Sequence, residues 1–158
     1  MNEIRNLHPD PRCLKVRTTW NGVSRANGEK WRYELNADSS SGSVFVWNGL
    51  TNQFLAGKVL YARVTSSKQA VLDRLDIESA SLLVRRNGWV AARVADGLVS
   101  NHAIWLKYGP FVLQEVGCYS PEDWELLYAL YQSGAIQFPW VAGPRDATMA
   151  GQIGPWEL

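Results

Sequence analysis

Two large aromatic side chains alternate with valines in the segment SVFVW, residues 43–47. In a β-strand, Phe45 and Trp47 project from one face, while Val44 and Val46 project from the other. The valines are typical of a core, whereas a face open to solvent seldom carries both a phenyl ring and an indole. Exposed rings of this kind stack nucleic-acid bases, and each stacked base contributes about 1–3 kcal/mol with little sequence preference. The spacing therefore makes Phe45 and Trp47 candidate stacking platforms.

Basic residues accompany these rings along the first half of the chain. Those expected on the same surface are Lys15, Arg17, Arg25, Lys30, Arg32 and Lys68. A cationic groove interleaved with rings suits a flexible polyanion, because the cations neutralise phosphates while the rings hold the bases. The pattern predicts a single-stranded nucleic acid, DNA or RNA, as partner.

A second interpretation of the same rings is burial. Trp124 and Tyr131 belong to a predicted C-terminal helix and need a surface to pack on. A sheet that is covered on both faces produces strands with large apolar residues on both sides. The sequence leaves the exposure or burial of Phe45 and Trp47 open.

Residues of the types that perform catalysis are sparse and scattered. His8 and His102 have no nucleophile near them in the sequence, and no phosphate-binding loop, GxSxG or HExxH motif is present. Asp76 and Glu78 share a strand face, where a carboxylate pair binds a divalent ion or, more commonly, is solvated at an edge. We therefore predict no catalytic residues, no metal site and no cofactor, and a non-enzymatic function.

The composition is that of an ordinary globular protein. Of the 158 residues, 46% are hydrophobic and 20% charged, which suits one domain with a sizeable core. Cys13 and Cys118 form no CxxC motif, so buried free thiols are predicted rather than zinc ligands. No apolar run approaches the roughly 20 residues of a membrane span, and the N-terminus lacks the apolar core of a secretory signal. We expect a cytoplasmic protein with no membrane contact.

The net charge of +1 hides a division along the chain. Residues 1–93 carry 14 of the 16 basic and 8 of the 15 acidic residues, a charge of +6, whereas residues 94–158 carry −5. The basic part suits a polyanion, and the acidic part suits a protein partner or an oligomer contact. A protein partner bound through residues 94–158 and a homo-oligomer are therefore further expectations, with Trp156 and Leu158 as the candidate partner-binding tip.

Alternation of apolar and polar residues predicts a mainly β protein. The predicted strands are residues 14–20, 30–37, 43–48, 58–67 and 70–80, with a loop at 21–29 and a turn or single helical turn in 48–57. Asn87-Gly88 and Asp96-Gly97 indicate hairpins, although residues 89–95 also fit one or two helical turns. Residues 120–134 predict an α-helix, because Ser120 suits a cap, Pro121 the first turn and Gly134 the end.

The order of these elements resembles that of OB-fold nucleic-acid-binding domains, of the type found beside nucleases and in anticodon-binding modules of aminoacyl-tRNA synthetases. The residues that match that family's pattern are Asn27, Gly28, Lys30, Trp31, Leu35, Asp38, Gly42 and Val44, followed by Leu55, Gly57 and Leu60. Glu29 is an insertion relative to the pattern, and the resemblance covers residues 14–80, under half of the chain. It implies a five-stranded barrel that binds an oligonucleotide across strands two and three and the loops 1–2 and 4–5.

The expected fold is α+β and mainly β: a small five-stranded OB-like barrel with a C-terminal extension that contains β-hairpins and one α-helix. Its expected parts are an N-terminal arm (1–13), the barrel (14–80), a hairpin and helix extension packed on it (81–140) and an extended Gly/Pro-rich tail (141–158). The expected function is that of a small non-catalytic single-stranded nucleic-acid-binding protein. The alternative is a protein-interaction module, such as an inhibitor, adaptor or immunity-type protein, which the aromatic content and the acidic C-terminal half also favour.

Overall fold

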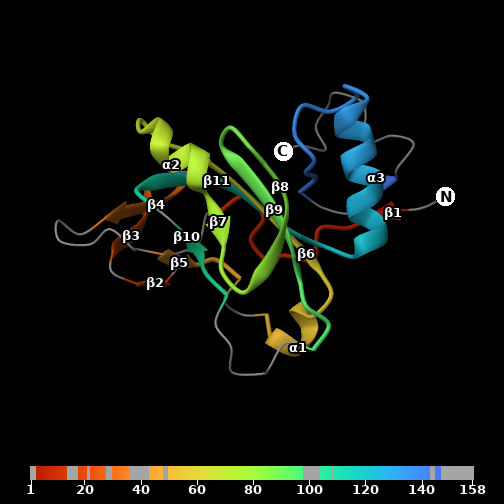
Figure 1. Ribbon diagram of the computed structural model, residues 1–158, viewed down its shortest axis with the longest axis horizontal. Coiled ribbons are helices and arrows are strands. Elements are labelled where there is room, and N and C mark those ends of the chain that lie inside the picture. The colour runs from red at the N-terminus through yellow and green to blue at the C-terminus, as the bar shows by residue number, and fades with distance from the viewer. Residues whose placement is uncertain are drawn as a thin grey trace.

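An open, six-stranded antiparallel sheet is the main structural element of the protein (Figure 1). The computed structural model describes residues 3–13, 18–20, 22–27, 30–35, 43–47, 50–97, 104–107, 109–142 and 145–146. The strands of the sheet, in spatial order, are β3 (Gly22–Asn27), β4 (Lys30–Leu35), β11 (Phe111–Tyr119), β6 (Val59–Thr65), β9 (Trp89–Val94) and β8 (Ala80–Arg86). Its two edge strands are therefore β3 and β8.

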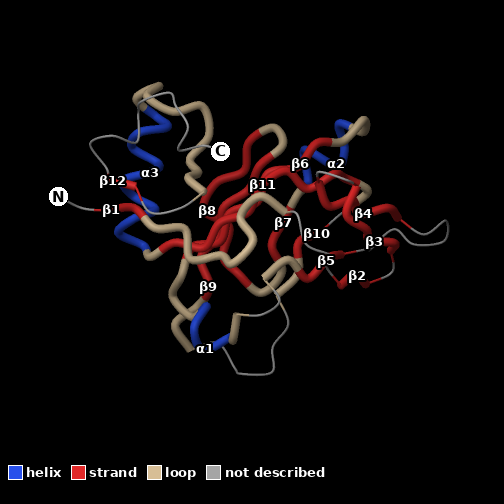
Figure 2. Tube along the Cα trace, turned by 180° about the vertical axis from the view of Figure 1, so that it is seen from behind, coloured by secondary structure: helices blue, strands red, loops and turns tan. Residues whose placement is uncertain are grey.

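Shorter elements surround this sheet. A second sheet has the order β2 (Thr18–Trp20), β5 (Ser43–Phe45), β10 (Leu106–Lys107) and β7 (Asp76–Ile77), and β1 (Glu3–Ile4) pairs with β12 (Arg145–Asp146). The described helices are α1 (Asn52–Leu55), α2 (Gln69–Arg74) and α3 (Pro121–Gln132). Figure 2 shows β1 and β12 next to α3 at one end of the molecule, and β2 to β5 at the other. The fold is α+β and mainly β, as predicted.

The predicted closure into a five-stranded barrel is wrong. β6 lies between β9 and β11, and both of these strands follow residue 80. Neither β3 nor β8 has a second neighbour in this sheet among the described strands, so the sheet stays open. Alternation in a sequence predicts on which face of a sheet a side chain lies, but it does not predict which strand pairs with the strand that carries it. The resemblance to the OB fold itself stays a prediction.

Alternation along β6 divides the interior into two cores, one on each side of the sheet. Leu60, Ala62 and Val64 point into an apolar core, and Val59 and Tyr61 point into an aromatic core, in the alternation predicted for residues 58–67. The apolar core is formed chiefly by Val44, Val46, Trp47, Leu60, Ala62, Val64, Leu75, Ile77, Val90, Leu106, Leu113, Val116 and Cys118. The aromatic core is formed chiefly by Val59, Tyr61, Trp89, Tyr119, Trp124, Leu127, Trp140 and Val141.

The predicted C-terminal helix is confirmed as α3. The Ser120 hydroxyl accepts a hydrogen bond from the N–H of Asp123 at 3.2 Å and caps the helix, and Pro121 occupies its first turn. Trp124 and Leu127 are buried in the aromatic core. In the described part of the chain, no helix combines the length and the apolar character that crossing a membrane requires.

Three other predictions are settled by the backbone. The predicted loop at 21–29 is wrong for residues 22–27, which form strand β3 and pair with β4. The predicted strand at 70–80 is wrong in its first half, because α2 spans Gln69–Arg74, and strand structure in the second half is limited to Asp76–Ile77 and the first residue of β8, Ala80. The hairpin around Asn87-Gly88 is confirmed by β8 and β9, which excludes the helical alternative for residues 89–95.

Candidate functional site

Trp47 is not a stacking platform. Its side chain is fully buried in the apolar core, and its indole N–H donates to the carbonyl oxygen of Gly117 at 3.3 Å. β5 ends at Phe45 and the chain turns at Val46 and Trp47, so the period-two pattern does not extend to the indole. The ring is also not beneath α3, because the apolar core lies on the opposite side of β6 from that helix. The candidate role of Trp47 as a stacking platform is therefore wrong.

The other predicted interface residues are placed only in part. Phe45, Arg25, Lys30 and Arg32 lie in described strands, but their side chains are outside the description. Their register brings Arg25 of β3 directly opposite Arg32 of β4, and Arg32 opposite Val112 of β11. Lys68 is exposed at the start of α2. The predicted residues outside the described ones are Lys15, Arg17, Trp156 and Leu158.

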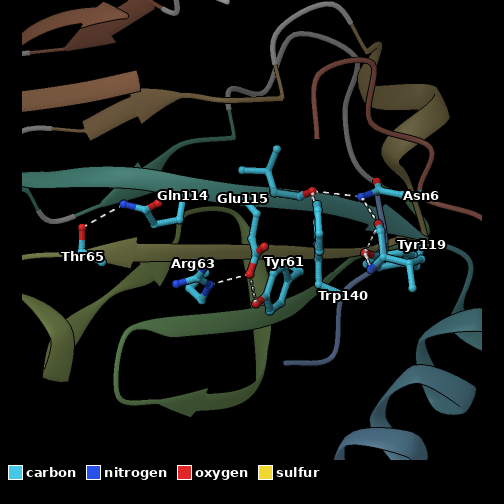
Figure 3. Close-up of polar contacts among 10 residues, drawn as sticks. Asn6, Tyr61, Arg63, Thr65, Gln114, Glu115, Tyr119 and Trp140 are labelled. Atoms are coloured by element: carbon cyan, nitrogen blue, oxygen red, sulfur yellow. Dashed lines mark hydrogen bonds and ion pairs between the residues drawn. The ribbon is translucent and has the colours of Figure 1, made fainter. Parts of the chain in front are cut away.

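A saturated polar cluster, the Asn6 cluster, consists of Asn6, His8 and the backbone groups they bond. Figure 3 shows Asn6 beside one end of β11. The Asn6 amide nitrogen donates to the carbonyl oxygens of Val116 at 3.0 Å and Val141 at 2.9 Å. Its amide oxygen accepts from the N–H groups of His8 and Cys118, both at 3.1 Å. An amide side chain has two donor hydrogens and two acceptor lone pairs, so all of its bonding capacity is used.

His8 is fixed in the same way. Its Nδ1 accepts from the N–H of Asp10 at 3.0 Å, so its Nε2 carries the hydrogen that bonds the carbonyl oxygen of Val46 at 2.6 Å. Both ring nitrogens are occupied and the residue is buried. The Asn6 cluster therefore joins the N-terminal segment to β11 and to the chain after β5, which is a structural role.

An unsaturated polar cluster, the Glu115 cluster (Glu115, Arg63 and Tyr61), lies on the α3 side of β11 and β6 (Figure 3). Leu113 pairs with Val64 and Glu115 pairs with Arg63, so Gln114 is an extra residue and forms a β-bulge. Simple alternation from Leu113 would direct Glu115 into the apolar core. The bulge instead puts Glu115 beside Arg63, on the side of Tyr61.

Both hydrogen bonds of the Glu115 carboxylate use one oxygen. Oε1 accepts from Arg63 Nε at 2.5 Å and from the Tyr61 hydroxyl at 3.3 Å. Burial and the adjacent Glu115 charge raise the pKa of Tyr61 well above its usual value, which keeps the hydroxyl a donor. Glu115 is only 8% exposed, yet Oε2 has no protein partner among the described residues.

A hollow of about 230 Å³ opens at this cluster. Its lining residues are Arg63, Glu115, Gln137, Phe138 and Trp140. The guanidinium carbon of Arg63 lies 4.3 Å from the centre of the Phe138 ring, and the Trp140 indole N–H donates to the Val116 carbonyl at 2.8 Å. Arg63 is thus held from two sides through Nε and its flat face, while its two terminal nitrogens make no hydrogen bond to the described residues.

The second unusual surface is the β8 edge, defined as Leu82, Leu83, Arg85, Arg86 and Arg93. Leu82 and Leu83 are each 47% exposed, and the only other exposed large apolar residue in the described part is Phe54, on α1. Leu82 pairs with Ala92 and Val84 with Ala91, so Leu83 is the extra residue of a second bulge. The bulge brings two adjacent leucines to the rim of the sheet.

Arginines flank the two leucines. Leu83 lines a hollow of about 250 Å³ together with Arg93 and Asp96, whose closest charged atoms are 3.6 Å apart. Toward the hairpin turn, Arg85 and Arg86 line a second hollow, of about 320 Å³, beside α2. Asp73 of α2 also lines this hollow. In both views the β8–β9 hairpin lies between α2 and α3 (Figures 1 and 2). This edge therefore combines apolar side chains with cations.

The sequence did carry signals for both surfaces. Glu115 is the only charged residue in the apolar run FVLQEVGCY, and Leu82-Leu83 interrupts the alternation of SLLVRR. At each position, the alternation of apolar and polar residues is shifted by one residue, which is the pattern that a β-bulge produces. Within the described ranges, no group of three His, Cys, Asp or Glu side chains is placed to hold a metal ion.

Comparison of the chain with protein-family models, with curated proteins and with solved structures gives no match. The geometry of the two surfaces is therefore the basis for a functional conclusion.

Proposed function

We propose that this chain is a non-catalytic protein-interaction module whose β8 edge binds an acidic and apolar segment of another protein. The observation that carries the proposal is the adjacent pair Leu82 and Leu83, each nearly half exposed on an edge strand. Covering such side chains with a partner is favourable, because apolar surface is removed from water.

The charges around the leucines indicate the chemistry of the partner. The cations on this surface are Arg85, Arg86 and Arg93 of the hairpin. Against these three stand the carboxylates of Asp73 and Asp96. An excess of positive charge accelerates the association of an acidic partner and disfavours a second copy of the same edge.

The bulge at Leu83 indicates how contact is made. Bulges interrupt the regular row of backbone groups on an edge strand and so oppose the addition of another strand. Side-chain contacts of Leu82 and Leu83, with arginines at the rim, are therefore the expected mode of binding.

The test uses fluorescein-labelled peptides of 12 residues and measures fluorescence anisotropy. A peptide of alternating Glu and Leu is expected to bind, whereas peptides of alternating Lys and Leu or Glu and Ser bind at least tenfold more weakly. Replacing both leucines (Leu82→Ser with Leu83→Ser) is expected to abolish binding of the Glu/Leu peptide. Phe54→Ser is the matched control, because it removes an exposed apolar side chain elsewhere. Equal binding of the three peptides, or no effect of the leucine substitutions, would refute the proposal.

Single-stranded nucleic acid is a second candidate partner, favoured by one specific observation. Arg25 and Arg32 are direct cross-strand neighbours at the β3 edge. Like charges in such positions repel and destabilise a sheet, which an anionic ligand between them would relieve. With Trp47 buried, this mode of binding relies on charge, with Phe45 as the one remaining candidate ring.

The two candidate functions can be distinguished by experiment, because they use opposite edges of one sheet. Nucleic-acid binding predicts that a 20-nucleotide oligothymidylate binds at low salt, that affinity falls steeply as salt rises, and that Arg25→Glu with Arg32→Glu abolishes binding. The leucine variant then binds the oligonucleotide normally. Oligothymidylate binding that resists salt, or that survives both arginine substitutions, would exclude this candidate.

A further inference from the structure

We propose that the hollow at the Glu115 cluster is a binding site for a small zwitterion that carries a carboxylate and a protonated amine, of the size of a free α-amino acid. This site is separate from the β8 edge and does not rest on the function proposed above. The observation is a part-buried ion pair whose two members both line one hollow and both keep atoms without a described protein partner.

Arg63 supplies the anion-binding half. Its Nε is engaged by Glu115 and its flat face rests on the Phe138 ring, so the guanidinium is held in one orientation. Its terminal nitrogens are free of described protein partners and form the fork that pairs with a carboxylate. The side chain is 24% exposed, which leaves this fork accessible to a ligand.

Glu115 supplies the cation-binding half. Its Oε1 is occupied by Arg63 and Tyr61, whereas its Oε2 is unoccupied by the described residues and belongs to a side chain that is about nine-tenths buried. This oxygen is not among the buried unpartnered atoms of the described residues, so it is accessible and can accept a hydrogen bond from an ammonium group on a ligand.

The pair as a whole selects a zwitterion over a simple ion. Arg63 and Glu115 together are neutral, so a lone anion at Arg63 also meets the charge of Glu115, and a lone cation meets that of Arg63. A ligand with both charges satisfies both partners at once. The hollow of about 230 Å³ has room for a ligand of amino-acid size.

The aromatic and amide walls complete the site. Trp140 is almost fully buried, and its N–H is used by Val116, so the ring offers an apolar wall to the ligand's side chain. Gln137 is exposed at the rim, where its amide can both donate and accept.

The experiment follows the Trp140 indole N–H in proton–nitrogen correlation spectra of the full chain, with that signal assigned by Trp140→Phe. Each of the twenty amino acids is added at 10 mM, with acetate and methylammonium as probes of one charge each. At least one amino acid is expected to shift the Trp140 signal in a saturable way, whereas acetate and methylammonium at the same concentration leave it in place. A spectrum that no amino acid changes would overturn the proposal.

Variants locate the binding. Arg63→Lys keeps the charge but loses the fork, and is expected to weaken binding at least tenfold, whereas Arg93→Lys, outside the hollow, leaves it unchanged. Phe138→Leu removes the ring under the guanidinium and provides a second variant if Arg63→Lys fails to fold. Amino-acid binding that is equal in the parent, Arg63→Lys and Phe138→Leu proteins would place it elsewhere and contradict the proposal.

Discussion

The Asn6 cluster and the Glu115 cluster both bring polar side chains to the buried strand β11, but they complete their hydrogen bonds to different degrees. Asn6 uses both donors and its acceptor oxygen twice, and both ring nitrogens of His8 are bonded. In the Glu115 cluster, one carboxylate oxygen and two guanidinium nitrogens lack a described protein partner, and both residues line a hollow.

This difference separates stability from function. A saturated cluster has no free hydrogen-bond donor or acceptor for a ligand, so its role is to stabilise the fold. The Asn6 cluster does this between the N-terminal segment and β11. In the unsaturated cluster, the free Glu115 oxygen and the Arg63 terminal nitrogens are not among the buried unpartnered atoms of the described residues, so they remain accessible. Accessible donors and acceptors of this kind are what a ligand needs for its own hydrogen bonds.

The largest effect is expected at the saturated cluster. Asn6→Ala removes four hydrogen bonds and leaves the N–H groups of His8 and Cys118 and two carbonyl groups without that partner. We expect the free energy of unfolding, measured with urea, to fall by about 2–4 kcal/mol. Gln132→Ala, at an exposed position at the end of α3, is the control and should change it by less than about 0.5 kcal/mol. An unchanged stability in Asn6→Ala would show that the saturated cluster is dispensable.

An intermediate effect is expected at alkaline pH, where groups adjoining both clusters act together. Burial raises the pKa of Cys118 from 9.0 to about 12, and burial also raises the pKa values of Tyr61 and Tyr119 well above 10.0. The folded state therefore retains protons that the unfolded chain releases. The resulting stabilisation is complete below about pH 9 and is lost as the pH rises from there toward 12.

Urea unfolding between pH 8 and pH 11 measures this decline. Cys118→Ala removes the thiol and should retain only the part of the decline that the tyrosines cause. A free energy of unfolding that stays constant to pH 11 in the parent protein would contradict the burial of all three groups.

The smallest effect on stability is expected at the β8 edge. Leu82→Ser with Leu83→Ser removes side chains that are already nearly half exposed, so the free energy of unfolding should change by no more than about 1 kcal/mol for the pair. The same substitutions are expected to abolish binding of the Glu/Leu peptide. A loss of stability well beyond this range would mean that the leucines support the fold rather than a partner.

Local features of the fold were predictable from the sequence, and pairings between distant segments were not. The helix at α3 follows from its cap and spacing, and the faces of β6 follow from alternation. Alternation does not identify which strands pair, however. The barrel expected over residues 14–80 was therefore wrong, and the structure has an open sheet in which β6 pairs with β9 and β11.

The site residues could not be predicted correctly for a related reason. Trp47 follows the end of β5, where the chain turns and period two no longer applies, so its ring enters the core. Glu115 and Leu83 lie at or beside bulges, which shift alternation by one residue and are defined by the partner strand. Their surroundings become visible only when both strands of each pair are known.

The most direct test compares Glu115→Gln with Asn6→Ala by urea unfolding in one buffer without ligand. We expect Glu115→Gln to cost about 1 kcal/mol, because the amide oxygen still accepts from Tyr61 and Arg63 is partly solvated, and Asn6→Ala to cost at least about 1 kcal/mol more. A cost for Glu115→Gln equal to or greater than that for Asn6→Ala would contradict the distinction between a saturated, structural cluster and an unsaturated, ligand-binding one.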